Sequence, residues 1–210
     1  MNLVDQIGKL LNYGLFPPIC RLCGNAGLPD WDMCLHCHRV LPRRPAPKLF
    51  GEGLVLAGFD YSTPIDGLIR HFKFHGQLDA GHLLARLCEP VFEDSRPMAL
   101  VPVPLHLRRL RQRGFNQSLE LARYWGRRRA LPVLSGALVR HRETAVQSSL
   151  SAAERETNVQ GAFRIEQPLP AHVALVDDVF TTGATCGAAR DALLAAGVKR
   201  VDVWCLARVP

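Results

Sequence analysis

The stretch VALVDDVFTTGAT, residues 173–185, decides the fold and locates the candidate site. Its apolar start predicts a buried strand that ends in two adjacent carboxylates, Asp177 and Asp178. Burying two neighbouring charges without partners is costly, so we expect both side chains to face an open cleft and to meet hydrogen-bond donors there. A loop that only turned the chain would need neither carboxylate.

Small and hydroxyl-bearing residues follow the carboxylates and lead into an expected helix. Their backbone N–H groups and hydroxyls, together with the positive end of the helix, can surround a phosphate. The residues concerned are Thr181, Thr182, Gly183, Ala184 and Thr185. A ribose 5-phosphate offers a diol to the carboxylates and a phosphate to this loop. In the alternative interpretation, Asp178 only precedes a turn and a threonine caps the helix.

Outward from this motif, strand patterns alternate with helical ones. This alternation predicts an α/β fold with a mostly parallel sheet covered on both faces, and ligands bind such sheets at the carboxyl ends of the strands. Strands are expected at 53–61, 98–104, 137–141, 162–165, 172–178 and 198–208, and helices within 64–92 around a turn at 75–76, at 116–129 and at 185–197.

Four cysteines in CRLCGNAGLPDWDMCLHC, residues 20–37, have the spacing C-x2-C-x10-C-x2-C. Two residues between paired cysteines let both thiolates reach one metal ion from a tight turn, which Gly24 suits. We predict a structural zinc ion held by Cys20, Cys23, Cys34 and Cys37. Substitution of one ligand by His36 or His38 and a pair of disulfides are the alternatives.

The chain divides into two predicted domains. Residues 1–45 would form an N-terminal helix, indicated by the apolar spacing at 3–11, followed by the zinc-binding module. The proline- and glycine-rich segment 41–53 is predicted to be a linker. Residues 46–210 would form the α/β domain. The other cysteines, Cys88, Cys186 and Cys205, lie in apolar contexts typical of a core.

The net charge of +7 is unevenly distributed. Eight arginines and one acid lie between positions 105 and 129, which indicates a phosphate-binding face or a solvated surface. The first residues are a poor signal peptide, and no apolar run is long enough to span a membrane. We therefore expect a cytoplasmic protein without membrane insertion.

Three segments together resemble one known family. VALVDDVFTTGAT resembles the phosphoribosyl pyrophosphate (PRPP) signature of type I phosphoribosyltransferases. LVPVPLHLRRLRQRGFNQSLELAR (100–123), RHRETAVQSSLSAAERETNVQGAF (140–163) and the four-cysteine module are similar to the ComF family. The resemblance covers nearly the whole chain and implies a type I phosphoribosyltransferase fold.

The resemblance also implies roles for the opening motif. Asp177 and Asp178 would bind the ribose hydroxyls, and residues 181–185 would bind the 5′-phosphate. Pyrophosphate would leave C1 with Mg²⁺ on the ligand's own oxygens, because Mg²⁺ relies on substrate phosphates.

The departing pyrophosphate needs cations nearby. Arg113 is the first candidate, followed by Arg108 and Arg109 in an expected loop over 104–115. Lys73, flanked by aromatic residues, either reaches a phosphate or extends to solvent. Together with the two aspartates, Lys73 and Arg113 form the predicted catalytic set. The stretch 140–155 resembles the flexible loop that closes over such sites, and no residue set identifies the acceptor.

Two functions remain open. The first is a PRPP-dependent phosphoribosyltransferase-like protein, linked through the family to DNA uptake in natural competence. The second is a non-catalytic protein that binds single-stranded DNA, with PRPP as a structural or regulatory ligand. Competence-machinery proteins are implied as partners in both. Phe115, Tyr124 and Trp125 could stack on bases, or pack in the core as their helical spacing favours.

Overall fold

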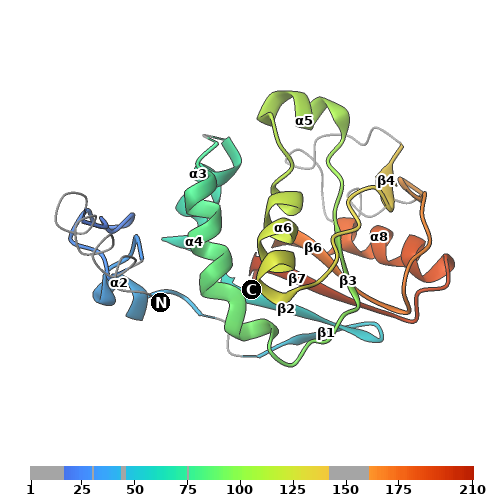
Figure 1. Cartoon of the computed structure of the whole chain (residues 1–210), viewed down its shortest axis with the longest axis horizontal. Helices are drawn as coiled ribbons and strands as arrows, with labels where there is room; N and C mark the ends of the chain where they lie inside the picture. The colour runs from blue at the N-terminus through green and yellow to red at the C-terminus, as the bar shows by residue number, and fades with distance from the viewer. Residues whose placement is uncertain (1–16, 30, 44–45, 75, 142–160) are drawn as a thin grey trace, which may run out of the picture. The chain divides into compact units, whose positions relative to one another are not determined.

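The structure, a computed structural model, describes residues 17–29, 31–43, 46–74, 76–141 and 161–210 (Figure 1). The chain divides into two compact units, residues 1–42 and 43–210. The helix expected at 3–11 and most of the loop expected at 140–155 lie outside the described residues. In the described part of the chain, no helix is both long and apolar enough to cross a membrane.

The first unit is built on two cysteine turns. An antiparallel bridge joins Ile19 to Ala26. Between them the N–H of Gly24 donates to the carbonyl of Cys20 at 2.9 Å, and Gly24 has φ +74°, as the predicted tight turn requires. The second turn leads into helix α2 (Leu35–Arg39), whose N-cap is Cys34.

The second unit contains a five-stranded sheet in the order β1-β2-β7-β6-β3. All neighbouring pairs are parallel except β1 and β2, which are antiparallel. The strands are β1 (Lys48–Phe50), β2 (Gly53–Asp60), β3 (Ala99–Pro102), β6 (His172–Phe180) and β7 (Arg200–Arg208). A separate antiparallel pair joins β4 (Leu138–Arg140) to β5 (Phe163–Ile165).

Helices cover both faces of this sheet. Helix α8 (Ala184–Ala195) packs on one face, where Cys186, Ala189 and Leu193 join the alternate residues Val201, Val203 and Cys205 of β7. On the other face, Trp204 of β7 stacks on Phe92 at 4.4 Å between ring centroids. This face carries α4 (Leu78–Cys88), the short helix η1 (Glu89–Phe92) and α6 (Gln117–Arg129); α3 (Ile65–Phe74) packs on α4. The predicted mixed α/β fold with a mostly parallel sheet is confirmed.

The predicted linker 41–53 is wrong in its second half. Lys48–Phe50 forms β1, an edge strand, and Gly51 with φ +61° turns the chain into β2. Phe50 packs edge-on against Phe180 at 5.4 Å. The strand has only three residues and exposes Leu49, so it lacks the alternating pattern that marks a longer strand.

The predicted loop 104–115 is also wrong, because Leu107–Arg113 forms helix α5. The His106 side chain accepts the N–H of Arg108, and Gly114 ends the helix with φ +78°. Helix α5 has no buried residue. Without an apolar face packed on a core, it has little of the periodicity that predicts a helix.

Candidate functional site

Asp177 and Asp178 lie near the carboxyl end of β6, and both have partners. The Asp178 carboxylate is buried, and its Oδ1 lies 2.9 Å from Nζ of Lys73 on α3. Asp177 is half-buried, and its Oδ1 accepts the hydroxyl of Ser118 at 3.1 Å and the N–H of Asp178 at 2.9 Å. The sheet and two helices therefore meet at these carboxylates, as the sequence predicts for charges that need donors.

The segment after β6 forms a tight loop at the start of α8. Gly183 is the N-cap, in the left-handed region with φ +83°, and the N–H of Ala184 donates to Oγ1 of Thr182 at 3.4 Å. The first turn of α8 then presents the N–H groups that an α-helix leaves without intrahelical acceptors. This is the arrangement that binds phosphates at helix N-termini.

A cavity of about 140 Å³ brings the motif and the cations together. Of the predicted cations, Lys73, Arg109 and Arg113 line it, whereas Arg108 lies on the opposite side of α5 with His106 and Arg111. The predicted ligand-binding residues that also line it are Asp177, Asp178, Thr181, Thr182, Gly183 and Thr185; Ala184 lies next to it at the start of α8.

The surroundings of Arg113 hold it at the cavity. Its NH1 donates to Oε1 of Gln117 at 3.0 Å, and its guanidinium lies 5.0 Å from the centroid of the Phe74 ring. Burial lowers the pKa of Arg113, and Asp178 opposes that effect. Arginine stays protonated in proteins, so the cavity retains this positive charge.

Three residues at the cavity were not predicted as site residues. Arg140, at the end of β4, lines it, as do Ser118 and Cys186. Cys186 was expected in the core; it is buried, and its thiol also donates to Oδ2 of Asp177 at 3.7 Å. A serine two positions after the N-cap asparagine of α6 is an ordinary helix start, so the sequence carries no signal for this role.

The environment shifts the pKa of Asp177. Burial and the neighbouring charge of Asp178 raise it from 3.8 to about 6, while the Asp178 N–H, Lys73 and Ser118 act in the opposite direction. The carboxyl group therefore changes its charge close to neutral pH, unlike an ordinary exposed aspartate.

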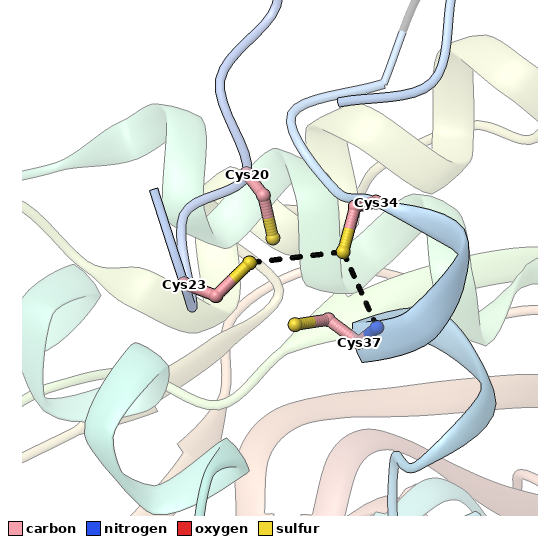
Figure 2. A group of neighbouring side chains, drawn as sticks. All are labelled: Cys20, Cys23, Cys34 and Cys37. Carbon is pink, nitrogen blue, oxygen red and sulfur yellow. Dashed lines mark hydrogen bonds between the residues drawn. The ribbon is translucent and has the colours of Figure 1, made fainter. Parts of the chain in front are cut away.

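The four predicted zinc ligands converge in the first unit (Figure 2). Their sulfur atoms all lie within 4.8 Å of one another, and Cys23 and Cys34 are 3.7 Å apart. A tetrahedral zinc ion with Zn–S bonds of about 2.3 Å requires sulfur atoms about 3.8 Å apart. The cluster could therefore hold a structural zinc ion.

Hydrogen bonds within the cluster favour metal-binding thiolates. The N–H of Cys37 donates to Sγ of Cys34 at 3.4 Å. Burial raises the pKa of Cys20, but backbone N–H groups of Cys34, Cys23 and Leu22 outweigh it and bring the pKa to about 6. All four are free cysteines, which excludes the disulfide alternative in this structure.

The arginine-rich segment has partners of its own. Arg123 pairs with Glu120 at 2.8 Å and Arg128 with Glu89 at 3.0 Å. Trp125 is fully buried in the core, so it does not offer a face to bases. Tyr124 stacks on His82 at 5.5 Å, and Phe115 contacts Phe72 at 5.7 Å.

Comparison with known proteins gives the family. No family model matches the chain. DNA utilization protein YhgH of Escherichia coli (strain K12) is 38% identical over 195 residues, which cover 89% of this chain and 84% of that protein. Competence protein F of Haemophilus influenzae is 34% identical over 197 residues, with the same two coverages. The chain belongs to the ComF family.

A more distant ComF relative shows the same relationship. Competence protein ComFC of Streptococcus pneumoniae is 28% identical over 151 residues, which cover 71% of this chain and 66% of that protein. The family predicted from the residues in 20–37, 100–123, 140–163 and 173–185 is thus confirmed.

Proposed function

We propose that this ComF protein binds PRPP in the cavity at the carboxyl end of β6 and serves DNA uptake or utilisation. One observation carries the proposal. The cavity joins two carboxylates, a phosphate-type loop at a helix N-terminus and four cationic side chains contributed by α3, α5 and β4. The names of the relatives, which refer to competence and DNA utilization, support the biological role.

The ligand's ribose 5-phosphate half matches the end of β6. Asp177 and Asp178 accept hydrogen bonds from the two ribose hydroxyls. Residues 181–185 and the first turn of α8 donate N–H groups to the 5′-phosphate, where the helix dipole favours negative charge. The diol and the phosphate thus lie one sugar apart, on one loop.

The pyrophosphate half needs positive charge, which Arg109, Arg113 and Arg140 supply from around the cavity. Lys73 is bound to Asp178 in the absence of ligand. When the ribose hydroxyl takes over Asp178, Lys73 becomes available to a phosphate oxygen. Magnesium bound to the phosphate oxygens would neutralise further charge on the leaving group.

In the transferase reaction, the bond between C1 and the pyrophosphate oxygen breaks as an acceptor atom bonds to C1. Asp177, Asp178, Lys73 and Arg113 are the proposed catalytic residues, because they touch the ribose or the departing pyrophosphate. The proposed organisation is a zinc-binding module within 1–45 that holds its own fold, followed by a phosphoribosyltransferase-like domain at 46–210.

Calorimetric titration tests the binding site. PRPP with Mg²⁺ is titrated into the wild type and into Asp178→Asn, which removes the acceptor charge while conserving size. The matched control is Asp191→Asn, an exposed carboxylate on α8 that does not line the cavity. We expect the heat of binding to vanish or weaken at least about tenfold in Asp178→Asn only. Equal heats in all three proteins would refute the site.

Turnover is tested separately by incubating the protein with PRPP, Mg²⁺ and a panel of nitrogenous acceptors while pyrophosphate release is measured. Acceptor-dependent release that Arg113→Ala abolishes would support a transferase. Binding of PRPP without release above the rate of the protein-free mixture would support a regulatory ligand.

The second candidate function is non-catalytic binding of single-stranded DNA, favoured by one feature of α5. This helix places Arg108 and Arg111 on an exposed face away from the cavity and has no buried residue. Fluorescence anisotropy of a labelled oligothymidylate over a salt series tests it. Removing both arginines should flatten the salt slope by about 0.7 per lost contact. A weak signal that does not depend on salt would reject this function.

A further inference from the structure

The Asp177 carboxylate is held from two helices that pack on opposite faces of the sheet. Ser118, in the first turn of α6, donates its hydroxyl to Oδ1 at 3.1 Å. Cys186, in the first turn of α8, donates its thiol to Oδ2 at 3.7 Å. Both side chains are buried, with exposed fractions of 3% and 2%.

The hydrogen bonds divide the two carboxylate oxygens unequally. Oδ1 accepts the Ser118 hydroxyl and also the N–H of Asp178, at 2.9 Å. An ionised carboxylate has about two acceptor positions on each oxygen, so Oδ1 is saturated. Oδ2 accepts only the weak thiol donor among the printed contacts of the described chain and keeps one position for a ligand.

We propose that Ser118 and Cys186 are positioning residues for Asp177: by engaging Oδ1 and Oδ2 from α6 and α8, they fix the carboxylate so that Oδ2 receives the ligand's hydroxyl. The proposal rests on the function above for the identity of the hydroxyl, but the arrangement of Asp177 does not depend on it. Neither residue needs to touch the ligand for this role.

Strong and weak donors have different consequences here. A hydroxyl bonded to a carboxylate stabilises the ionised form and lowers its pKa. A thiol is a weaker donor, so it orients Oδ2 while leaving that oxygen basic enough to accept a ligand hydrogen bond. The raised pKa of Asp177 agrees with this division, since its stabilising donors do not compensate for burial.

Other groups act on Asp177 from the surrounding elements. Charged or titratable side chains from every packed element contribute: Asp178 of β6, Lys73 of α3, Arg113 of α5, Arg140 of β4, Cys186 of α8 and Cys205 of β7. Substitutions at Ser118 leave all of these in place, so a change in titration reports the loss of the hydroxyl itself.

Direct titration of Asp177 in the full chain without ligand tests the proposal. Carboxyl ¹³C NMR follows its ionisation, and Asp177→Asn assigns the signal. We expect Ser118→Ala to raise the midpoint by about one pH unit and Ser118→Thr, which retains a hydroxyl, to restore it. Cys186→Ser, which introduces a stronger donor, should lower it. The control is Ser95→Ala, which removes an equally buried hydroxyl from a different carboxylate, Asp202.

An unchanged midpoint in a folded Ser118→Ala protein would overturn the proposal. If Ser118→Ala does not fold, Ser118→Cys substitutes a weaker donor of similar size and should raise the midpoint in the same direction, so an unchanged midpoint there has the same meaning. PRPP titration adds a second readout: Ser118→Ala should lose about tenfold in affinity, and Ser118→Thr should recover it. Failure of the wild type to bind PRPP would refute the proposed ligand, whereas the NMR midpoints would still decide the positioning role.

Discussion

Lys73 on α3 and Asp178 on β6 form an ion pair across the mouth of the candidate site, with Nζ 2.9 Å from Oδ1. Their side chains are 18% and 12% exposed, so solvent screens the pair only partly. The site thus contains its own counter-ion for one of the two carboxylates that define it. A ligand that takes over Asp178 must release Lys73.

A double-mutant cycle measures this pair. We expect Lys73→Met to lower the free energy of unfolding by about 1–3 kcal/mol, because it leaves a buried carboxylate without its cation. In the Asp178→Asn background the same change should cost much less, which gives a coupling energy of about 1–3 kcal/mol in urea unfolding. Arg70→Met is the control, since its pair with Asp66 on α3 is exposed and should contribute at most about 0.5 kcal/mol. Additive effects of Lys73→Met and Asp178→Asn would contradict the expectation.

Two arginines of one helix should behave differently toward PRPP. Arg113 lines the cavity, and Arg111 lies on the other side of α5. Removal of a charged donor to phosphate costs about 1.5–3 kcal/mol, so Arg113→Ala should weaken PRPP binding about 10- to 100-fold in calorimetry. Arg111→Ala should bind as the wild type does. Comparable losses in both variants would indicate a general effect of net charge instead of a specific contact.

Much of this site follows from residues that are close in the sequence. The apolar run before Asp177 predicts β6, and the glycine of the following loop predicts the start of α8, because local pattern and chain conformation agree there. Arg108 and Arg109 are adjacent, yet only Arg109 lines the cavity. Without knowing that α5 is a helix, no pattern separates them.

The remaining contacts depend on tertiary packing. Ser118 meets Asp177 only because α6 packs beside β6, and Arg140 reaches the cavity from a separate strand pair. Nothing in the local sequence of either residue encodes its partner. Strand β1 was missed for the opposite reason: three residues paired at a sheet edge give too short a pattern to recognise.

The raised pKa of Asp177 predicts a pH-dependent stability. Between its ordinary value of 3.8 and the folded value of about 6, the folded state binds more protons than the unfolded state, so stability falls as pH rises. Asp177→Asn removes this penalty. The variant's advantage over the wild type should therefore be larger near pH 8 than near pH 4, by up to about 3 kcal/mol. Urea unfolding at both values measures it, and an equal difference at the two pH values would contradict the assignment.

The cysteine cluster predicts a measurable zinc content. Protein purified without chelator should contain about one zinc ion per chain by elemental analysis, because four thiolates at tetrahedral spacing form a closed structural site. Cys37→Ala should lose the metal. Cys88→Ser is the control, since that buried cysteine lies in the second unit and its Sγ contacts the carbonyl of Leu206, which a hydroxyl can also reach. Zinc-free wild-type protein would refute the site.

Two glycines on either side of the first turn of α8 should respond in opposite ways to alanine. Gly183 has φ +83°, and a Cβ there would lie 2.6 Å from Cζ of Phe180, so Gly183→Ala both strains the backbone and displaces an aromatic ring. We expect a loss of about 1–3 kcal/mol in stability and loss of PRPP binding, because the N–H groups of the loop move. Gly187 lies inside the helix, where a Cβ would meet only Cζ of Phe50 at 4.0 Å. Gly187→Ala should therefore stabilise the protein by about 0.5–1 kcal/mol and leave PRPP affinity unchanged. Thermal unfolding and calorimetry of both variants measure the contrast, and a Gly183→Ala protein with wild-type stability and affinity would show that the loop does not require its left-handed residue.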